Sequence, residues 1–248
     1  VDDIVLLGDE LVESYVLIPE SNKFTIKELY GKNVFNSVVK PMADKFLFMS
    51  STILNKDGFC NDLGIDPRDT AFLSLDSEFD RDNRVVAYSP QTKMNYGWEK
   101  PERKEGRTRM IGAIKDIIEL HAGQSGIIHT GSFKIAKWII DELQMNTTHN
   151  ILHHNPSDDP KSRVTRDDVI AEYMGSAEGQ PTILVSPSIT EGLDLKGDLG
   201  RFAIFAKVPY PNISDAWVKR RMEISSNWYQ RQTLKEMIQG SGRICRSH

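Results

Sequence analysis

Short apolar runs recur along the chain, and most of them are bounded by Gly, Pro, Ser or Asp. The runs are almost wholly apolar instead of alternating between apolar and polar positions, a pattern typical of parallel strands covered on both faces. We therefore expect strands at seven places: Tyr15–Ile18, Phe46–Met49, Val85–Tyr88, Gly126–His129, Asn150–Leu152, Thr182–Val185 and Phe202–Ala206.

Between several of these runs the apolar positions follow a helical period. Arg107–Leu120 and Ser132–Leu143 each place an apolar stripe along one side of a helix, and Ser132 is a natural N-cap for the second. Strands that alternate with helices predict βαβ units. The fold class is therefore α/β, with a mostly parallel sheet flanked by helices.

Two polar segments rich in turn-forming residues, 54–84 and 90–106, interrupt this alternation. Within the second, residues 100–106 predict an exposed loop or linker. Residues 1–45 fit the alternation least. We expect them to be a lead-in belonging to a neighbouring domain, followed by one domain over residues 46–248.

The composition is that of an ordinary globular chain, with 39% hydrophobic and 27% charged residues. No apolar run approaches the roughly 18 residues of a membrane-spanning helix, so no membrane partner is predicted. Cys60 and Cys245 lie far apart, which favours a reducing cytoplasm, and two thiols cannot supply the usual four ligands of an iron–sulfur cluster. No metal site is predicted, because His153 and His154 would point to opposite faces of a strand.

Basic residues are concentrated in the last third of a chain whose net charge is −4. Between residues 207 and 246 there are three acidic residues and eight basic ones: Lys207, Lys219, Arg220, Arg221, Arg231, Lys235, Arg243 and Arg246. This asymmetry suggests a face that meets phosphate, although on charge alone a solvated helix face is the simpler interpretation. Tyr210 lies in the same region, where its ring could stack on a nucleic-acid base.

Three of the predicted strands run into chemically marked loops, at residues 130–132, 186–194 and 207–211. Ligands of doubly wound sheets bind at the carboxyl ends of the strands. We therefore expect these three loops to lie side by side.

The segment 239–246 carries the sharpest chemistry. Arg243 and Arg246 are three residues apart, so on a helix they project from one face, and Gln239 shares the face of Arg243. Two guanidinium groups at this spacing can grip successive oxygens of a phosphate chain. The alternative is a surface helix end whose arginines face its negative dipole.

The loop after the predicted strand Thr182–Val185 offers groups suited to phosphodiester oxygens. Ser188 and Thr190 supply hydroxyls, Gly192 permits a close backbone approach, and Asp194 could accept from a ribose hydroxyl or an arginine. The alternative is an ordinary strand-to-helix loop with an Asp cap.

Together these segments resemble a known family. Ser-x-Thr-Glu-Gly-x-Asp at 188–194, followed by Gln-x-x-Gly-Arg-x-x-Arg at 239–246, resembles motifs V and VI of superfamily 2 helicases. Lys-Val-Pro-Tyr-Pro at 207–211 is similar to the corresponding stretch of the XPD/DinG branch, residues 48–53 are similar to motif III, and residues 129–132 occupy the place of motif IV. The resemblance implies the second RecA-like motor domain of an ATP-dependent DNA helicase.

The resemblance also implies roles for individual residues. Arg243 and Arg246 would be arginine fingers in an interdomain ATP site, with Gln239 beside the γ-phosphate. The loop around Gly192 would couple nucleotide to DNA through Glu191 and Asp194. The residues expected to contact single-stranded DNA are Thr130, Ser132, Ser188, Thr190 and, from its basic surroundings, Tyr210. Ser50, Ser51 and Thr52 would link the two motor halves, although Ser51 replaces the usual Ala of motif III.

The chain contains neither Gly-x-x-x-x-Gly-Lys-Ser/Thr nor an Asp-Glu-Ala-His-like strand end. ATP and Mg²⁺ would then be held mainly by an N-terminal RecA-like domain that is absent from this sequence, and this fragment alone should not hydrolyse ATP. Two alternatives stay open. One is an RNA-directed or nuclease-fused translocase, and the other is a catalytically silent RecA-like module that docks nucleic acid or protein.

Overall fold

The computed structural model describes residues 14–19, 21–77, 79–83, 85–144, 147–154, 164–176, 179–188, 195, 197–242 and 244. These residues form two compact units. The first contains the described residues up to Asp76 together with Tyr210–Lys235, and the second contains those of Ser77–Pro209 and from Glu236 onward. The sequence predicts that residues 1–45 belong to a neighbouring domain and that a new domain begins at residue 46, and this boundary stays a prediction.

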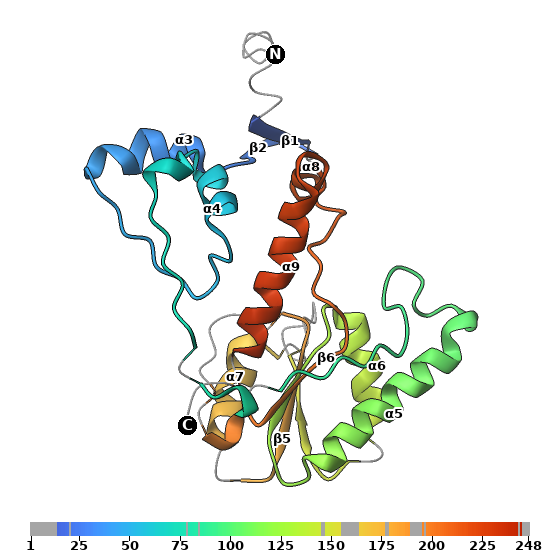
Figure 1. Cartoon of the computed structure of the whole chain (residues 1–248). Coiled ribbons are helices and arrows are strands. Elements are labelled where there is room, and N and C mark those ends of the chain that lie inside the picture. Colours follow the sequence, from blue (N-terminus) through green and yellow to red (C-terminus); the bar gives the residue numbers. More distant parts are fainter. Residues whose placement is uncertain are drawn as a thin grey trace. The chain divides into compact units, whose positions relative to one another are not determined.

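The second unit is built on a four-stranded parallel sheet (Figure 1). Its strands are β3 (Gly126–His129), β4 (Asn150–Leu152), β5 (Thr182–Ser186) and β6 (Phe202–Phe205), in the order β4-β5-β3-β6. The four corresponding predictions from the sequence are confirmed to within one residue at each end. Their nearly unbroken apolar character reflects burial on both faces, since all residues of β3 and β5 are buried.

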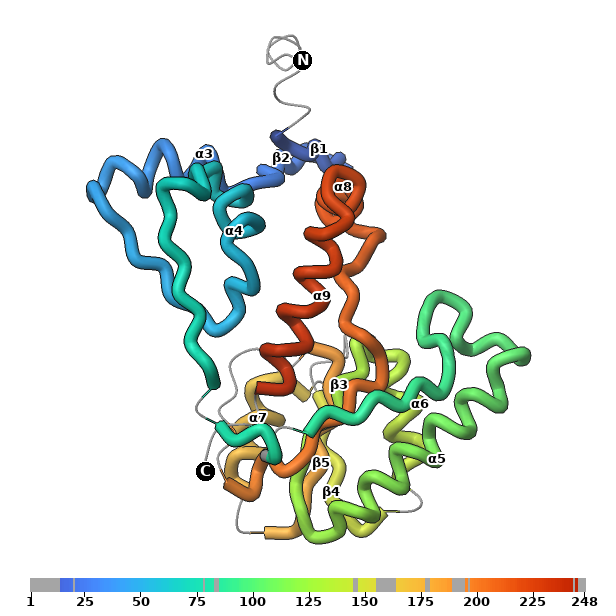
Figure 2. The backbone as a smooth tube through the Cα atoms, in the orientation of Figure 1, coloured from blue at the N-terminus to red at the C-terminus, as the bar shows by residue number. Residues whose placement is uncertain are grey.

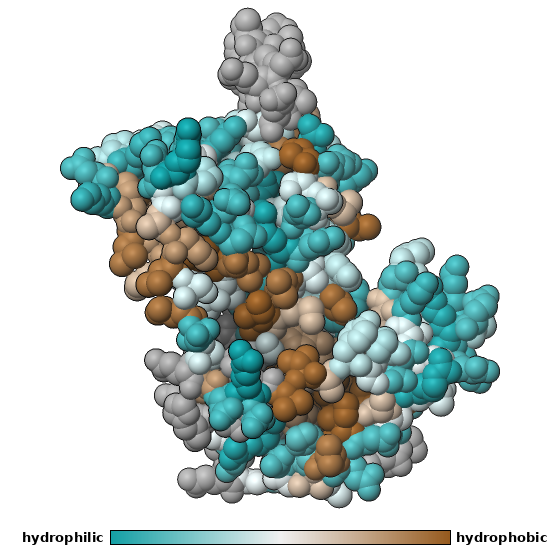
Figure 3. Space-filling view, viewed as in Figure 1, coloured by the Kyte–Doolittle hydropathy of each residue, from teal (hydrophilic) through white to brown (hydrophobic). Residues whose placement is uncertain are grey.

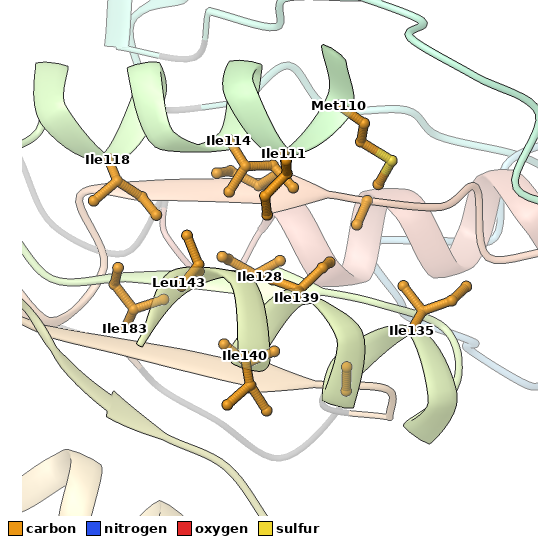
Figure 4. Packing of buried hydrophobic residues seen from close by; sticks show 14 of the residues in the cluster. Met110, Ile111, Ile114, Ile118, Ile128, Ile135, Ile139, Ile140, Leu143 and Ile183 are labelled. Carbon is orange, nitrogen blue, oxygen red and sulfur yellow. The ribbon is translucent and has the colours of Figure 1, made fainter. Parts of the chain in front are cut away.

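Helices cover both faces of this sheet. On one face, α5 (Lys104–Leu120) and α6 (Phe133–Leu143) bury their apolar stripes against alternate strand residues, and Figure 4 shows Ile114 of α5 and Ile139 of α6 turned toward Ile128 of β3. On the other face, α7 (Arg166–Gly175) buries Tyr173 beside Ile127. Successive residues of one strand thus serve opposite layers, which is the α/β arrangement expected from the sequence.

Tyr173 fastens α7 to the edge of the sheet where the strands begin. Its hydroxyl lies 2.5 Å from the carbonyl oxygen of Leu199 and 3.2 Å from that of Gly126. Burial of the ring raises the pKa of this hydroxyl, so it stays a neutral donor.

The start of α6 follows its sequence signal closely. Ser132 caps the helix, and its hydroxyl accepts a hydrogen bond from the Ile135 amide at 3.3 Å. In contrast, the prediction of an exposed loop over residues 100–106 is wrong, because a 3₁₀ turn at Pro101–Arg103 leads directly into α5 at Lys104. Proline fits the first position of such a turn, since its missing amide hydrogen has no partner there.

Two predicted strands are absent. Phe46–Met49 and Val85–Tyr88 are not paired with any strand of the described residues. Figure 2 shows the path of the backbone through both segments. Their outward side chains are exposed, with Leu47 at 83% and Val86 at 85%. An apolar run favours the strand conformation, but a strand also needs a neighbouring strand to hydrogen-bond with, and the described residues do not provide one here.

The first unit combines a small hairpin with helices. β1 (Tyr15–Pro19) pairs with β2 (Phe24–Glu28) in antiparallel register, so the predicted strand at Tyr15–Ile18 exists, but outside the parallel sheet. A helical segment follows, made of α3 (Lys32–Val34), a π-helical turn (Phe35–Val39) and a 3₁₀ turn (Lys40–Met42). The remaining helices are α4 (Lys56–Leu63), a 3₁₀ turn at Pro67–Asp69, α8 (Ala216–Ile224) and the start of α9 (Ser226–Ser241).

A buried arginine organises the first unit. The side chain of Arg221 on α8 is 3% exposed and donates to a carboxylate oxygen of Asp62 on α4 at 2.6 Å. Its guanidinium carbon lies 4.2 Å from the ring centre of Tyr30 and 4.9 Å from that of Trp228. The solvated helix face suggested for the basic residues of the last third is therefore wrong for Arg221, whose loss of hydration is compensated in part by the aromatic rings and the carboxylate.

We predict that Arg221→Met lowers the free energy of unfolding of the first unit by about 3 kcal/mol, since it removes a buried partner and leaves Asp62 with only the more distant Arg231. The loss should be visible in denaturant unfolding followed by tryptophan fluorescence. Arg220→Met is the matched control, because the side chain of Arg220 is 39% exposed and pairs with Glu223 only at 3.7 Å, so its loss should change stability by no more than about 0.5 kcal/mol. Equal effects of the two substitutions would contradict the stabilising role of the buried Arg221 and its contacts with Asp62, Tyr30 and Trp228.

Candidate functional site

The three marked loops follow neighbouring strands. β3 pairs with β5 on one side and with β6 on the other, with His129 opposite Ser186 and Phe205 at the ends of the ladders. All three strands are parallel, so their carboxyl ends meet at one edge of the sheet. The expected juxtaposition of the ends of these strands is confirmed.

The turn after β3 is shaped by its own hydroxyl groups. Thr130 is fully buried; its amide donates to Ser186 O at 2.9 Å and its hydroxyl to Ser132 O at 3.1 Å. Gly131 has a φ of 65°, a left-handed conformation that glycine adopts without strain. Thr130 therefore ties β3 to β5 and shapes the turn, while the half-buried Ser132 and the first amides of α6 lie at its open end.

The loop after β5 begins on a buried serine. The Ser186 hydroxyl accepts from the Ser188 amide at 3.3 Å, and Ser188 itself is exposed. The predicted residues Thr190, Glu191, Gly192 and Asp194 lie outside the described residues.

The stretch after β6 is divided between the two units. Tyr210 belongs to the first unit, where its ring stacks on that of Tyr229 with centroids 5.6 Å apart and planes at 8°. The Tyr229 hydroxyl donates to Pro211 O at 3.0 Å, and burial, followed by the neighbouring Tyr210, raises its pKa. Tyr210 is still 56% exposed. Tyr229 lies in the same basic region of the sequence, but its stacking on Tyr210 was not predicted, because residues 19 positions apart carry no sign of such a contact.

The end of α9 reaches the same sheet edge. Gly240 is buried beside Phe205 and His129, and a Cβ atom built on it would lie 2.8 Å from Phe205 Cζ. Gln239 is half-buried on the same turn of α9. Arg243 and Arg246 lie outside the described residues, although Ile244 between them is described and packs against Gly200. The structure thus brings Gln239 and Gly240 to the ends of β3 and β6.

A buried histidine follows the edge strand β4. His154 lies against Phe133 with ring centres 5.1 Å apart and planes at 86°. Burial, and then the nearby charges of Arg166 and His153, lower the pKa of His154 below 6.5. Within the described residues no group of three or more His, Cys, Asp or Glu side chains could hold a metal ion.

These features coincide with a known family. The model of the family described as "Helicase C-terminal domain" matches residues 114–248, which include the whole sheet and the end of α9. The chain belongs to the helicase C-terminal domain family. This confirms the resemblance drawn from the motifs.

A solved XPD helicase has the fold of this helicase domain. The two superpose with a TM-score of 0.58 and share 15% sequence identity, over 98% of this chain and 43% of that one. The helicase domain therefore has the RecA-like fold expected from the sequence, and it spans less than half of the XPD helicase. No curated protein sequence matches it. In the described part, no helix combines the length and apolar character needed to cross a bilayer.

The lowered pKa of His154 makes a prediction about acid stability. Its folded form binds a proton less readily than the unfolded chain, so stability should fall as the pH drops below about 6.5, the ordinary histidine value. We expect His154→Gln to lose less melting temperature than wild type between pH 7 and pH 5, as measured by calorimetry. His153→Gln is the control. If it reduces the loss of melting temperature between pH 7 and pH 5 as much as His154→Gln does, the burial of His154 is not the cause.

Proposed function

We propose that this helicase domain is the C-terminal motor half of an ATP-dependent DNA helicase. It would supply arginine fingers to an ATP site shared with an N-terminal RecA-like domain, and backbone contacts to single-stranded DNA. The observation that carries this proposal is the convergence of the end of α9 with the ends of β3 and β6, because it puts the segment bearing Gln239 at the edge where such sheets bind ligands.

The nucleotide side of the proposal rests on residue chemistry. Arg243 and Arg246 can stabilise charge that develops on a transferred phosphoryl group, and Gln239 can orient a water or a phosphate oxygen. Glu191 and Asp194 would link this site to the DNA loop, Asp194 through the ribose. The sequence offers these groups to ATP, but it contains no Asp-Glu-Ala-His-like strand end of the kind that holds Mg²⁺ in such motors. Mg²⁺ would therefore be held mainly by the N-terminal half.

The DNA side uses backbone contacts and stacking. Ser188 and Ser132, with the first amides of α6, offer donors to phosphate oxygens without reading sequence. We also propose a DNA-contacting role for Thr190, and for Thr130 a role in shaping the turn that presents Ser132. In the first unit, the stacked ring of Tyr210 is a platform for a base. A motor that moves along any sequence needs contacts of this kind.

The partner domain has a candidate contact surface. In the first unit, two extended segments expose large apolar side chains that a stable monomer rarely leaves open: Leu47, Met49, Leu73 and Leu75. Apolar surface gathers below α3 and α4 in Figure 3. We propose that the N-terminal motor domain covers this surface. Ser50 and Thr52 of the motif III segment follow Met49 directly in the sequence, and they are hydrogen-bonded to each other.

We expect Arg243→Ala to lower the kcat of DNA-stimulated ATP hydrolysis by roughly 10³-fold in the full-length chain, because an arginine finger stabilises the transition state. The KM for ATP should change little. Arg201→Ala is the control, since Arg201 pairs with Asp198 at an exposed site and should leave turnover unchanged. A wild-type chain that folds and binds DNA but shows no turnover would sink the motor and favour a silent docking module.

Single-strand binding can be measured on the domain itself. We predict that Tyr210→Ala weakens binding of a labelled oligothymidine roughly 10-fold by fluorescence anisotropy, whereas Tyr210→Phe retains it, because the stack needs only the ring. Tyr96→Ala serves as the control, since Tyr96 is fully exposed elsewhere. If Tyr210→Ala binds the oligothymidine as tightly as wild type does, Tyr210 has no stacking role. If the equivalent RNA binds more tightly than the DNA, an RNA-directed motor is favoured.

A further inference from the structure

Gly240 occupies a position where a glycine is otherwise unfavourable. It lies inside α9, near its end, and alanine is the better helix former at such a position. Glycine inside a helix therefore signals a close packing contact or a functional need. The neighbourhood supplies the contact: an added Cβ atom would lie 2.8 Å from Phe205 Cζ, 3.2 Å from Phe205 Cε1 and 3.6 Å from His129 Nε2.

Two features restrain the side chains that face Gly240, namely stacking and strand pairing. Phe205 stacks on His129 with ring centres 4.6 Å apart and planes at 20°, and both residues stand at the ends of paired strands. His129 is itself buried, and its carbonyl oxygen accepts from the Ala206 amide at 2.9 Å. Strand pairing fixes the backbone of each residue and the stack restrains its ring, so an added methyl group on residue 240 would have to displace the half-buried ring of Phe205.

A second glycine makes the same kind of contact on the other side of the motif. Gly200 lies just before β6, and a Cβ atom there would lie 3.3 Å from Ile244 Cα and 3.0 Å from Leu195 Cβ. Ile244 is the residue directly after Arg243. Both ends of the segment 240–244 therefore pack against β6 or its lead-in. An added Cβ atom would collide at Gly240, and at Gly200 it would fit only if its neighbours shifted by a few tenths of an ångström.

We propose that Gly240 and Gly200 are positioning residues, which seat the segment carrying Arg243 on β6 at a fixed height. The inference rests on the proposed function, since it names what places the arginine finger. Proximity gained by such placement is sensitive, because a shift of about 1 Å can cost roughly 100-fold in rate. We call the packing of Gly240 and Gly200 against their neighbours the seat. If the proposal holds, the position of Arg243 depends on this seat as well as on the conformation of its own side chain.

The closing experiment compares two Gly→Ala substitutions within helices of the full-length chain. Gly240→Ala should lower the kcat of DNA-stimulated ATP hydrolysis at least about 10-fold with the KM for ATP retained. Gly112→Ala in α5 is the matched control, because an added Cβ there meets nothing within 4 Å, and it should keep wild-type turnover. Phe205→Leu removes the ring atoms that the added methyl group would strike, so combining it with Gly240→Ala should restore kcat to that of Phe205→Leu alone.

Hydrogen exchange reads the seat without any activity. The Gly242 amide donates to Ile238 O at 2.9 Å, and Gly240→Ala should speed its exchange while Gly112→Ala does not. Gly200→Ala should speed exchange at the Ile244 amide in the same way. Wild-type exchange and wild-type kcat in Gly240→Ala would overturn the inference. A wild-type chain without turnover but with the predicted exchange pattern would overturn the proposed function and leave the seat standing.

Discussion

The pairing of β3 with a parallel neighbour on each side is the constraint on which the candidate site depends. β3 is hydrogen-bonded to β5 and to β6, and every residue along it is buried. Because α5 and α6 cover one face and α7 the other, the strand can shift neither along its neighbours nor out of the sheet without exposing apolar side chains. The turn at Thr130, the loop at Ser188 and the end of α9 are all placed by this one strand.

The first unit solves a different problem with a different device. Its hairpin has only two strands and its helices are short, so it has little apolar core of its own. Its elements meet instead around the buried guanidinium of Arg221, which pairs with Asp62 and lies against the rings of Tyr30, Trp217 and Trp228. An ion pair of this kind requires one geometry to be favourable, so it favours one docking position of α8 where apolar contacts would tolerate several.

Much of the second unit could be predicted from the sequence, because its signals are local. Runs of four or five apolar residues mark buried strands, and Ser132 marks the start of α6. The helix α4 also carries local signals, namely Asn55 as N-cap and Gly64 in the left-handed conformation after its end. The strands predicted at 46–49 and 85–88 do not form, because an apolar run does not encode whether a neighbouring strand is present.

Contacts between residues far apart in the sequence were harder to foresee. The burial of Arg221 depends on rings contributed by residues 30, 217 and 228, and the stacking of Tyr210 on Tyr229 joins two positions far apart in sequence. No local pattern encodes such encounters. The helix-interior glycine at 240 is visible in the sequence, and only the packing of Phe205 against it explains why alanine does not stand there.

That contact also constrains how the sequence can drift over evolution. Positions 205 and 240 divide one fixed volume between them, with a phenyl ring on the strand and a hydrogen atom on the helix. A relative with a larger residue at the helix position needs a smaller one at the strand position. A change at either site alone leaves a steric clash or an unfilled space, and is therefore selected against. The two positions should therefore covary, although 35 residues separate them in sequence.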